Sequence, residues 1–384
     1  MHIGFATLKK VPDFNKSQMN KLVVGNILYR PVRSAISVLA VAIEVIMILS
    51  IVAIMVGMVQ SAAKQTSGIG ADIIVQPPGA SFISAVGGAP VPAKVATVLA
   101  KMPHVVVASP VAIQLNVSKS VQSVYGIDYE TYNALRPFNY LAGGPFTGPD
   151  SAIVDDLYAR ANHLSAGSTM TLNGHDYHVT GIVEHGKGSR IFMPIETVAA
   201  QMGSPGNATI FYLRSDDPKN EQAIIDEIQN TPTLSTYKAQ TLSDWMSMMT
   251  PEHLPGFNIA LRVVIFIAVI VGFLVIFQSM YTAVMERTRE IGILKSLGAS
   301  KLYIMNLVLR EAVLVAVVGI LLGIGLTEAL KFGVSVKFPT IPFFVTNTLR
   351  AQGAAIALVG SVLGALYPAW KGASKDPIDA LAYE

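Results

Sequence analysis

One glycine- and lysine-containing segment of the sequence comes close to a nucleotide-binding motif. Gly181, Gly186 and Lys187 match most of the phosphate-binding pattern GxxxxGK[ST]. The hydroxyl residue that would hold Mg²⁺ in that loop is replaced by Gly188, and no helical pattern follows it. The segment therefore predicts a glycine-rich surface turn, and we expect no nucleotide site in this chain.

Histidines cluster in the same part of the sequence, where they could suggest a metal site. His175 and His178 lie three residues apart, with His163 and His185 on either side. Residues three apart on a strand face opposite sides, and zinc usually takes three or four protein ligands. We therefore expect surface histidines and no bound metal. The chain has no cysteine, and neither paired carboxylates nor a nucleophile triad occurs at chemical spacing, so the sequence favours a non-catalytic protein.

Two polar residues lie inside long apolar segments. Glu44 lies nine residues into the first such segment, about 13 Å from its inner end, and Gln278 lies about 10 Å from the inner end of the second. Ionisable groups at such depth usually face the interior of a helix bundle. The two side chains could share a hydrogen bond. A packing contact and a proton or substrate site both remain open for Glu44.

The positions of the apolar residues predict a membrane protein. Hydrophobic residues make up 52% of the 384 residues, charged residues only 14%, and the mean hydropathy is +0.49. A bilayer core needs roughly 20 consecutive apolar residues. Four segments satisfy this and predict transmembrane helices at residues 35–58, 259–285, 307–330 and 351–367. A polar leader precedes the first, so we expect a retained anchor and not a cleaved signal peptide.

The distribution of basic residues predicts the orientation. Residues 1–34 carry six basic groups and one acid, and residues 286–306 carry four basic groups. Lys and Arg concentrate in cytoplasmic segments, so both of these and the C-terminus are expected in the cytoplasm. Residues 59–258 have a net charge of −5, which leaves +8 for the rest of the chain. That stretch is expected on the outer side.

Residues 59–258 predict a globular domain that mixes strands and helices. Asn173 and Gly174 form a hairpin signal between two β-rich runs, and residues 77–92 are rich in Pro and Gly. The β-rich runs are residues 71–76, 104–108, 121–127, 177–183 and 208–213, and the helical patterns are residues 93–102, 155–163, 195–202 and 219–230. The predicted fold class is therefore four transmembrane helices with a large extracytoplasmic α/β (α+β) domain between helices 1 and 2.

Pairs of glycines at a spacing of four mark the last two predicted spans. Gly319 and Gly323 form one pair, and Gly360 and Gly364 form the other. This spacing lets helix backbones approach closely. The neighbouring helix belongs either to the same chain or to a second copy.

The loop between the second and third spans combines charges with an apolar stripe. Ile291, Leu294 and Leu297 recur at helical spacing, Gly298 is placed to end that helix, and Ser300 is placed to cap the next one. One interpretation is a helix lying in the membrane interface. The other is a rigid elbow that docks on a cytoplasmic partner. Amphipathic segment 17–33 and a short helix starting at residues 376–377 are expected at the two ends of the chain.

Five segments together resemble a known family. ERTREIGILKSLGAS (residues 286–300), LREAVLVAVVGILLGIGL (309–326) and YPAWKGASKDPIDAL (367–381) resemble the FtsX-like permease domain of MacB-type ABC transporters. GADIIVQPPG (70–79) and MTLNGHDYHVTGIVEHG (170–186) are similar to the periplasmic core domain of that family. The resemblance covers nearly the whole chain. MacB carries its own ATPase in one chain, whereas this chain shows none, so we expect a separate ATPase.

The resemblance implies a non-catalytic permease subunit in the bacterial inner membrane. Its partners would be an ABC ATPase dimer, a second permease copy or related permease, and the lipid bilayer, with or without a periplasmic adaptor protein, and nucleic acid is not expected among them. ATP and Mg²⁺ would be bound by the ATPase, so no cofactor is expected in this chain. The implied ATPase-coupling interface consists of Glu286, Arg287, Arg289, Glu290, Leu294, Lys295, Gly298, Lys301, Asp376 and Pro377.

Two functions follow from this resemblance. The first is export of amphiphilic substrates such as drugs, peptides, lipids or lipoproteins. The second is mechanical regulation of an outer partner such as a cell-wall hydrolase, with no substrate moved. A stand-alone receptor or anchor would leave the loop chemistry unexplained. The expected organisation is a cytoplasmic segment (1–34), span 35–58, the outer domain (59–258), span 259–285, the coupling loop (286–306), span 307–330, an outer loop (331–350), span 351–367 and a tail (368–384).

Overall fold

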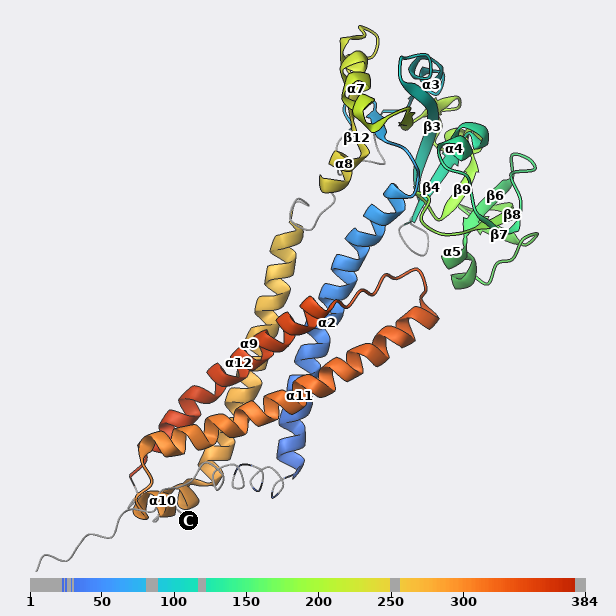
Figure 1. Ribbon diagram of the computed structural model, residues 1–384. Helices are drawn as coiled ribbons and strands as arrows, with labels where there is room; N and C mark the ends of the chain where they lie inside the picture. The colour runs from blue at the N-terminus through green and yellow to red at the C-terminus, as the bar shows by residue number, and fades with distance from the viewer. Residues whose placement is uncertain are drawn as a thin grey trace, which may run out of the picture. The chain divides into compact units, whose positions relative to one another are not determined.

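The computed structural model describes residues 23, 25, 29, 31–80, 89–116, 122–248 and 256–376 (Figure 1). The chain divides into two compact units. We call Met1–Ile54, Asn258–Gly333 and Phe343–Glu384 the helical unit, and Met55–Phe257 with Val334–Pro342 the sheet unit. Most of the amphipathic segment expected at 17–33, part of the expected loop 77–92, and Pro377 lie outside the described residues.

Long apolar helices build the helical unit. Within the described residues, four helices are long and apolar enough to cross a bilayer. They are α2 (Pro31–Ser67), α9 (Phe257–Glu286), α11 (Lys301–Lys337) and α12 (Asn347–Ser374). With 37 residues, α2 is about 55 Å long, well beyond a bilayer core of about 30 Å. The helices continue past the predicted spans, so the span limits stay predictions.

Small residues set the packing within the helical unit. A Cβ atom added at Gly319 of α11 would lie 2.7 Å from the Cβ of Val41 on α2, and one at Gly323 would lie 2.8 Å from that of Val45. On α12, a Cβ at Gly364 would lie 2.8 Å from the Phe273 carbonyl oxygen of α9. These glycines therefore contact helices of the same chain.

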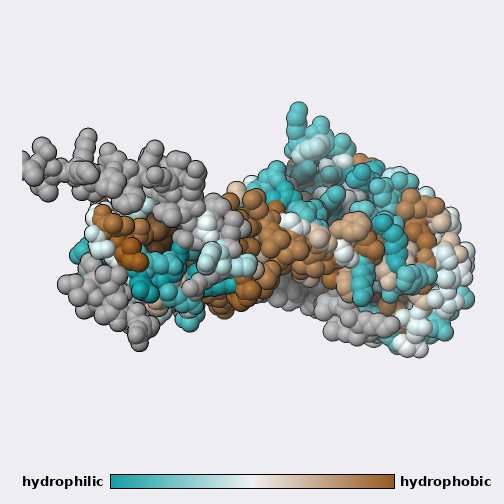
Figure 2. All heavy atoms as spheres, turned by 90° about the horizontal axis from the view of Figure 1, so that it is seen from below, coloured by the Kyte–Doolittle hydropathy of each residue, from teal (hydrophilic) through white to brown (hydrophobic). Residues whose placement is uncertain are grey.

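The outward faces of these helices remain apolar. On α9, Ile259 is 69% exposed and Phe266 is 64% exposed, and on α11 Leu321 is 66% exposed. Figure 2 shows hydrophobic areas on the surface of the long helices. Apolar side chains of this kind suit contact with lipid tails. The backbone suits it too, because a helix pairs its N–H and C=O groups internally.

A mixed sheet forms the core of the sheet unit. In the described part of the chain it has ten strands, in the order β12-β1-β11-β3-β4-β9-β6-β8-β5, with β7 paired to β8. Two pairs, β4/β9 and β6/β8, are parallel, and the other pairs are antiparallel. The strands are β1 (Ile73–Gln76), β3 (Val105–Asn116), β4 (Gln122–Ile127), β5 (Tyr140–Gly143), β6 (Ser151–Asp155), β7 (Thr169–Leu172), β8 (His175–Val183), β9 (Ile191–Pro194), β11 (Ile210–Ser215) and β12 (Lys238–Thr241).

Short helices accompany this sheet. They are α3 (Val95–Leu99), α4 (Tyr129–Leu135), α5 (Asp156–Ala161), α6 (Ile195–Gln201), α7 (Glu221–Asn230) and α8 (Leu242–Met248). A 3-10 turn, Pro218–Asn220, precedes α7. A separate two-stranded ladder joins β2 (Val91–Pro92) to β10 (Asn207–Ala208). The β7–β8 hairpin turns at Asn173 and Gly174, whose φ angles are +52° and +80°. This is the backbone conformation that an Asn-Gly turn requires. The predicted fold class is confirmed, with apolar helices and a mixed α/β domain between the first two.

Candidate functional site

The elbow, residues 287–300, joins α9 to α11 through the short helix α10 (Thr288–Ser296). Arg287 breaks the helix, with φ −108° and ψ 18°. Gly298 ends α10 with φ +95°, a conformation that favours glycine, and the Ser300 hydroxyl accepts a 3.2 Å hydrogen bond from the Tyr303 amide. The stop and the cap that the sequence predicts are therefore both formed.

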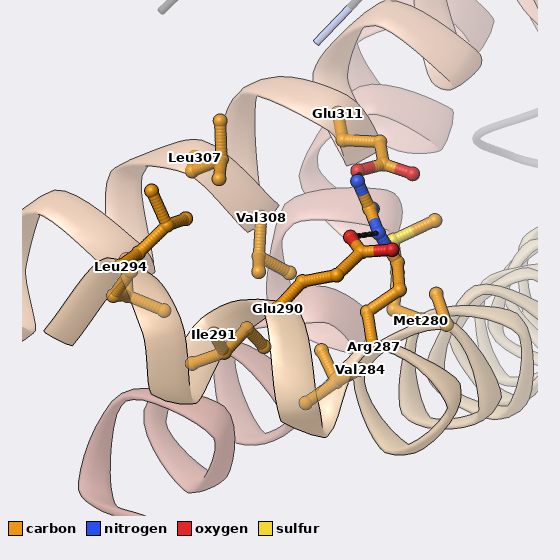
Figure 3. Close-up of a pocket in the computed structure, with 11 residues that line it drawn as sticks. Met280, Val284, Arg287, Glu290, Ile291, Leu294, Leu307, Val308 and Glu311 are labelled. Carbon is orange, nitrogen blue, oxygen red and sulfur yellow. Dashed lines mark hydrogen bonds and ion pairs between the residues drawn. The ribbon is translucent and has the colours of Figure 1, made fainter. Parts of the chain in front are cut away.

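Arg287 fixes the start of the elbow to α11. Its Nη1 donates to Oε2 of Glu311 at 2.8 Å, and its Nε donates to Oε2 of Glu290 at 3.2 Å. Figure 3 shows the guanidinium between the two carboxylates. The Glu311 side chain is only 5% exposed, whereas that of Glu290 is 65% exposed. The pair with Glu311 is thus the one shielded from water.

A second arginine reaches the same carboxylate from α2. Arg33 Nη1 lies 2.9 Å from Oε2 of Glu286, and Nη2 lies 3.8 Å from Oε1 of Glu311. Glu311 therefore contacts arginines from two separate elements, and it joins α2, the elbow and α11. A buried carboxylate needs such partners because leaving it unpaired is strongly destabilising.

The end of α12 packs against α10. Lys295 Nζ donates to the carbonyl oxygen of Ala373 at 3.0 Å and to that of Lys375. A cation at this place satisfies carbonyl groups that have no partner within the helix and complements its dipole. The same end of α12 also lies close to α9, because a Cβ at Gly372 would lie 2.7 Å from Val284 of α9.

A small cavity lies between the elbow and the two helices that it joins (Figure 3). Its volume is about 70 Å³, and Arg287, Glu290 and Glu311 line it together with apolar side chains. The apolar lining residues are Met280, Ala283, Val284, Ile291, Leu294, Ile304, Leu307 and Val308. Pockets for drug-sized ligands measure roughly 300–1,000 Å³, so this cavity is too small for a substrate of that size.

Exposed apolar residues lie among charges on one surface, which we call the outer face of the elbow and which includes the first turn of α11. Ile293 is 45%, Leu297 63% and Leu302 70% exposed. Arg289 and Lys301 are exposed beside them. The predicted stripe of Ile291, Leu294 and Leu297 is divided, because Ile291 is buried and Leu294 half-buried. Leu297, which follows the last residue of α10, Ser296, is the exposed member of the stripe.

Comparison with known proteins matches both parts of the chain. Residues 34–231, which are more than half of the 384, match the family of MacB-like periplasmic core domains, and residues 262–377 match the FtsX-like permease C-terminal domain. The chain belongs to the FtsX/MacB-type family of ABC transporter permeases. The resemblance noted in the sequence is thereby confirmed.

Relatives of this FtsX/MacB-type permease include ABC transporter permeases and macrolide export proteins. The ABC transporter permease YknZ of Bacillus subtilis (strain 168) is 23% identical over 281 residues, covering 70% of this chain and 69% of YknZ. The macrolide export ATP-binding/permease protein MacB of Neisseria meningitidis (strain Z2491) is 23% identical over 394 residues, covering 95% of this chain and 60% of MacB. The chain thus spans less than two thirds of the length of that relative. The crystal structure of the periplasmic region of MacB from Actinobacillus actinomycetemcomitans has a TM-score of 0.37 and 16% identity, covering 48% of this chain and 94% of that one.

The other residues of the implied interface of this FtsX/MacB-type permease differ in their surroundings. Glu286 is exposed but bonded to Arg33, and Lys295 is half-buried under the end of α12. Asp376 is exposed at the last described position, and Pro377 lies outside the described residues. The structure therefore separates residues that hold the elbow internally from Arg289 and Lys301, which face outward.

The two intramembrane polar residues of the permease do not meet. Glu44 is 2% exposed, and neither of its carboxyl oxygens has a hydrogen-bond partner among the described residues. The expected bond to Gln278 is therefore wrong. The carboxyl group packs on Gly272 of α9, where an added Cβ would lie 2.0 Å from Oε2, and Gly360 of α12 is 4.0 Å away by the same measure. Gln278 is exposed on another face of α9, since six residues of α-helix bring a rotation of about 240°.

The histidines of the sheet unit bond to neighbouring carboxylates. His175 Nε2 lies 3.0 Å from Asp150, and His185 Nδ1 lies 2.8 Å from Asp156. The carboxylate of Asp156 has its pKa lowered chiefly by the bonds from His185, against the opposing effect of burial. Among the described residues, no group of three or more His, Asp or Glu side chains could hold a metal ion.

Sequence reasoning did not assign a role to Arg33 or Glu311. Both lie near the ends of predicted spans, where basic and acidic side chains usually reach the interface. The available signal was the position of Glu311 at the start of an apolar run, because such a carboxylate needs a cationic partner. The sequence offered several candidate arginines and no means to choose among them.

Proposed function

We propose that this permease couples ATP hydrolysis by a separate ABC ATPase subunit to motion of its sheet unit, and that the motion serves export of amphiphilic substrates. Drugs, peptides, lipids and lipoproteins are the substrate classes in question. The observation that carries the proposal is the buried Glu311, which joins the elbow, α11 and α2 through Arg287 and Arg33.

This arrangement supports transmission of force from the elbow. A push on its outer face would act on α10, which Lys295 ties to α12 and Arg287 ties to Glu311. Arg33 then connects Glu311 to α2, which continues as one helix to Ser67 in the sheet unit. A buried ion-pair network responds as a unit because separating one charge from it is unfavourable.

In this proposal the ATPase sits at the outer face of the elbow. Arg289, Lys301, Leu297 and Leu302 offer the apolar centre with charged surroundings that is typical of interaction surfaces. ATP and Mg²⁺ belong to the ATPase, and this chain supplies no catalytic group. A second permease, identical or related, completes the membrane part, and a periplasmic adaptor protein is a further partner. The protein lies in a bacterial inner membrane, and both of its termini face the cytoplasm.

The test is ATP turnover of the complex recovered through a tag on the full chain from its native membrane. Leu297→Asp places a charge in the centre of the outer face, while Leu141→Asp makes the same change at an exposed site on β5, 58% exposed. We expect Leu297→Asp to lower permease-stimulated ATP turnover at least about tenfold, as expected for an interface anchor, and Leu141→Asp to leave it unchanged. Normal turnover in the Leu297→Asp complex would contradict the coupling role.

The same complex distinguishes the two functions of such a permease. Export predicts that transport of a fluorescent amphiphile into proteoliposomes depends on ATP and falls with Leu297→Asp. Recovery of a cell-wall hydrolase, with hydrolase activity that depends on ATP and no amphiphile movement, would replace export by mechanical regulation. Glu286 and Glu290 are less suitable for this test because both bond to arginines of this chain.

A further inference from the structure

A polar cavity in the sheet unit lies where the last turn of α2 meets the loop after β8. Its volume is about 260 Å³. Its lining includes Lys64 from α2 and Gly68 directly after it, Arg136 and Asn139 from the segment after α4, and Glu184 and Lys187 from the loop after β8. This volume lies just below the roughly 300–1,000 Å³ of pockets for drug-sized molecules, so it suits a small charged group.

The walls of the cavity are held by backbone contacts. A Cβ at Gly68 would lie 1.6 Å from the carbonyl oxygen of Gly186, so the end of α2 touches the loop directly. The Gly188 amide donates to the Gln65 carbonyl at 2.9 Å, and the Tyr132 hydroxyl donates to the Lys187 carbonyl at 2.6 Å. The loop that resembles a phosphate-binding motif is thus seated on α2.

Three cations line this cavity against one carboxylate. The Lys187 ammonium is buried, donates to the Arg136 carbonyl and lies 5.5 Å from the centre of the Phe138 ring. Burial and the nearby Arg136 guanidinium lower the pKa of Lys187 to about 8. An anion in the cavity would oppose both effects and favour the charged amine.

The remaining charges around the cavity leave an excess of positive charge. Lys64 and Arg136 are exposed, and within the described residues no ion pair joins either of them or Lys187 to a carboxylate. Glu184 accepts a 2.8 Å hydrogen bond from Asn139, and His185 is bonded to Asp156. Basic side chains thus concentrate here in a domain whose net charge is −5.

The position along α2 indicates the source of the anion. The predicted span ends at Met58, and Lys64 lies six residues farther along the same helix, about 9 Å. The headgroup layer on each side of a bilayer is roughly 5–8 Å thick. A lysine side chain at this distance reaches lipid phosphates by snorkelling back along the helix.

We propose that this cavity binds a phosphate-bearing anion, supplied by the headgroup of an acidic phospholipid in the leaflet next to the sheet unit. Lys64 and Arg136 contact the phosphate from the open side, and Lys187 closes the inner side. The inference is independent of the proposed coupling to an ATPase, because it uses residues of the sheet unit only.

The test counts lipids bound to the full chain by native mass spectrometry after release from nanodiscs. One nanodisc mixes phosphatidylglycerol with phosphatidylcholine, a second contains phosphatidylcholine alone, and a third is phosphatidylcholine with inorganic phosphate. The test variant is Lys64→Gln with Arg136→Gln. The matched control is Lys101→Gln with Lys238→Gln, which removes two exposed charges elsewhere in the sheet unit.

We expect the wild type and the control to retain phosphatidylglycerol, and the test variant to bind it about thirtyfold more weakly. Inorganic phosphate that binds as tightly as phosphatidylglycerol would support the anion site and replace the lipid by a soluble source. Equal retention of phosphatidylglycerol by the test variant and the control would overturn the site.

A second measurement uses only the unmodified protein. Amide hydrogen exchange of residues 184–188 should slow in phosphatidylglycerol nanodiscs relative to phosphatidylcholine, because the ligand closes the cavity over this loop. Unchanged exchange there, with phosphatidylglycerol present in excess, would also contradict the proposal.

Discussion

Arg287 and Glu311, 24 residues apart in the chain, form an ion pair of 2.8 Å across the elbow (Figure 3). The same arginine contacts Glu290 at 3.2 Å on the exposed side. One guanidinium thus serves two carboxylates whose surroundings differ, which allows the internal and the surface interaction to be measured separately.

Glu311→Gln should destabilise the protein much more than Glu290→Gln. Removing the buried carboxylate leaves Arg287 and Arg33 with a neutral partner, and we expect a loss of about 3 kcal/mol in unfolding free energy. Glu290 is 65% exposed, so its substitution should change stability by less than about 1 kcal/mol. Unfolding of the full chain in detergent measures both, and equal losses would contradict the role of Glu311 as the central residue.

Gly323→Ala should lower stability, whereas Gly325→Ala on the same helix should not. The added methyl group at Gly323 meets Val45 of α2 at 2.8 Å, and at Gly325 it meets nothing within 4 Å. Overpacking of this kind typically costs about 1–3 kcal/mol, while alanine in an open helical position gains up to about 1 kcal/mol. Thermal unfolding compares the two variants. Similar melting temperatures would show that α2 and α11 are not in close contact there.

Glu44→Met should stabilise the helical unit. The carboxyl group is buried on Gly272 and has no hydrogen-bond partner in the described residues, so an unbranched apolar side chain removes an unsatisfied polar group. We expect a gain of about 1–3 kcal/mol, with Glu44→Gln close to the wild type. A loss of stability would show that the carboxyl group has a partner. Normal stability with lost transport would identify Glu44 as a functional carboxyl group.

Stability of the sheet unit should rise between about pH 8 and pH 10.5 because of Lys187. The folded protein releases the Lys187 proton at a pKa of about 8, whereas the unfolded chain keeps it to about 10.5. The unfolded state therefore binds more protons in this range, so unfolding becomes less favourable as the pH rises. We expect a gain of about 2 kcal/mol that Lys187→Met abolishes and Lys101→Met retains.

Tryptophan fluorescence can follow the Lys187 effect in the full chain. Trp245 is buried in the sheet unit and Trp370 lies on α12, so a Trp370→Phe background leaves a reporter in the sheet unit alone. The same pH dependence in the Lys187→Met protein and the parent would assign the effect to another group.

Local patterns were sufficient to predict much of this fold. The Asn173-Gly174 turn, the stop at Gly298 and the cap at Ser300 depend on the backbone preferences of single residues, and the structure forms all three. The apolar runs predicted four helices because a bilayer demands length and hydrophobicity from each segment separately. Such features need no knowledge of distant parts of the chain.

Contacts between distant residues could not be predicted in this way. Depth alone suggested that Glu44 and Gln278 could meet, but depth does not specify which face of a helix a residue occupies. Arg33 and Glu311 lie 278 positions apart, and their meeting depends on how α2 and α11 pack through Gly319 and Gly323. The pairing of β3 with β11 likewise follows from the whole sheet and not from either strand.

The contact between α2 and α11 imposes a rule on the length of the chain within the helical unit. Val41 and Val45 lie four residues apart on α2, and they meet Gly319 and Gly323, which lie four residues apart on α11. One inserted or deleted residue within either pair would turn one of the two contact positions by roughly 100° and shift it by about 1.5 Å. No single-residue change of length there can therefore keep both contacts, so helical phase, as much as side-chain identity, is what these two segments have to preserve.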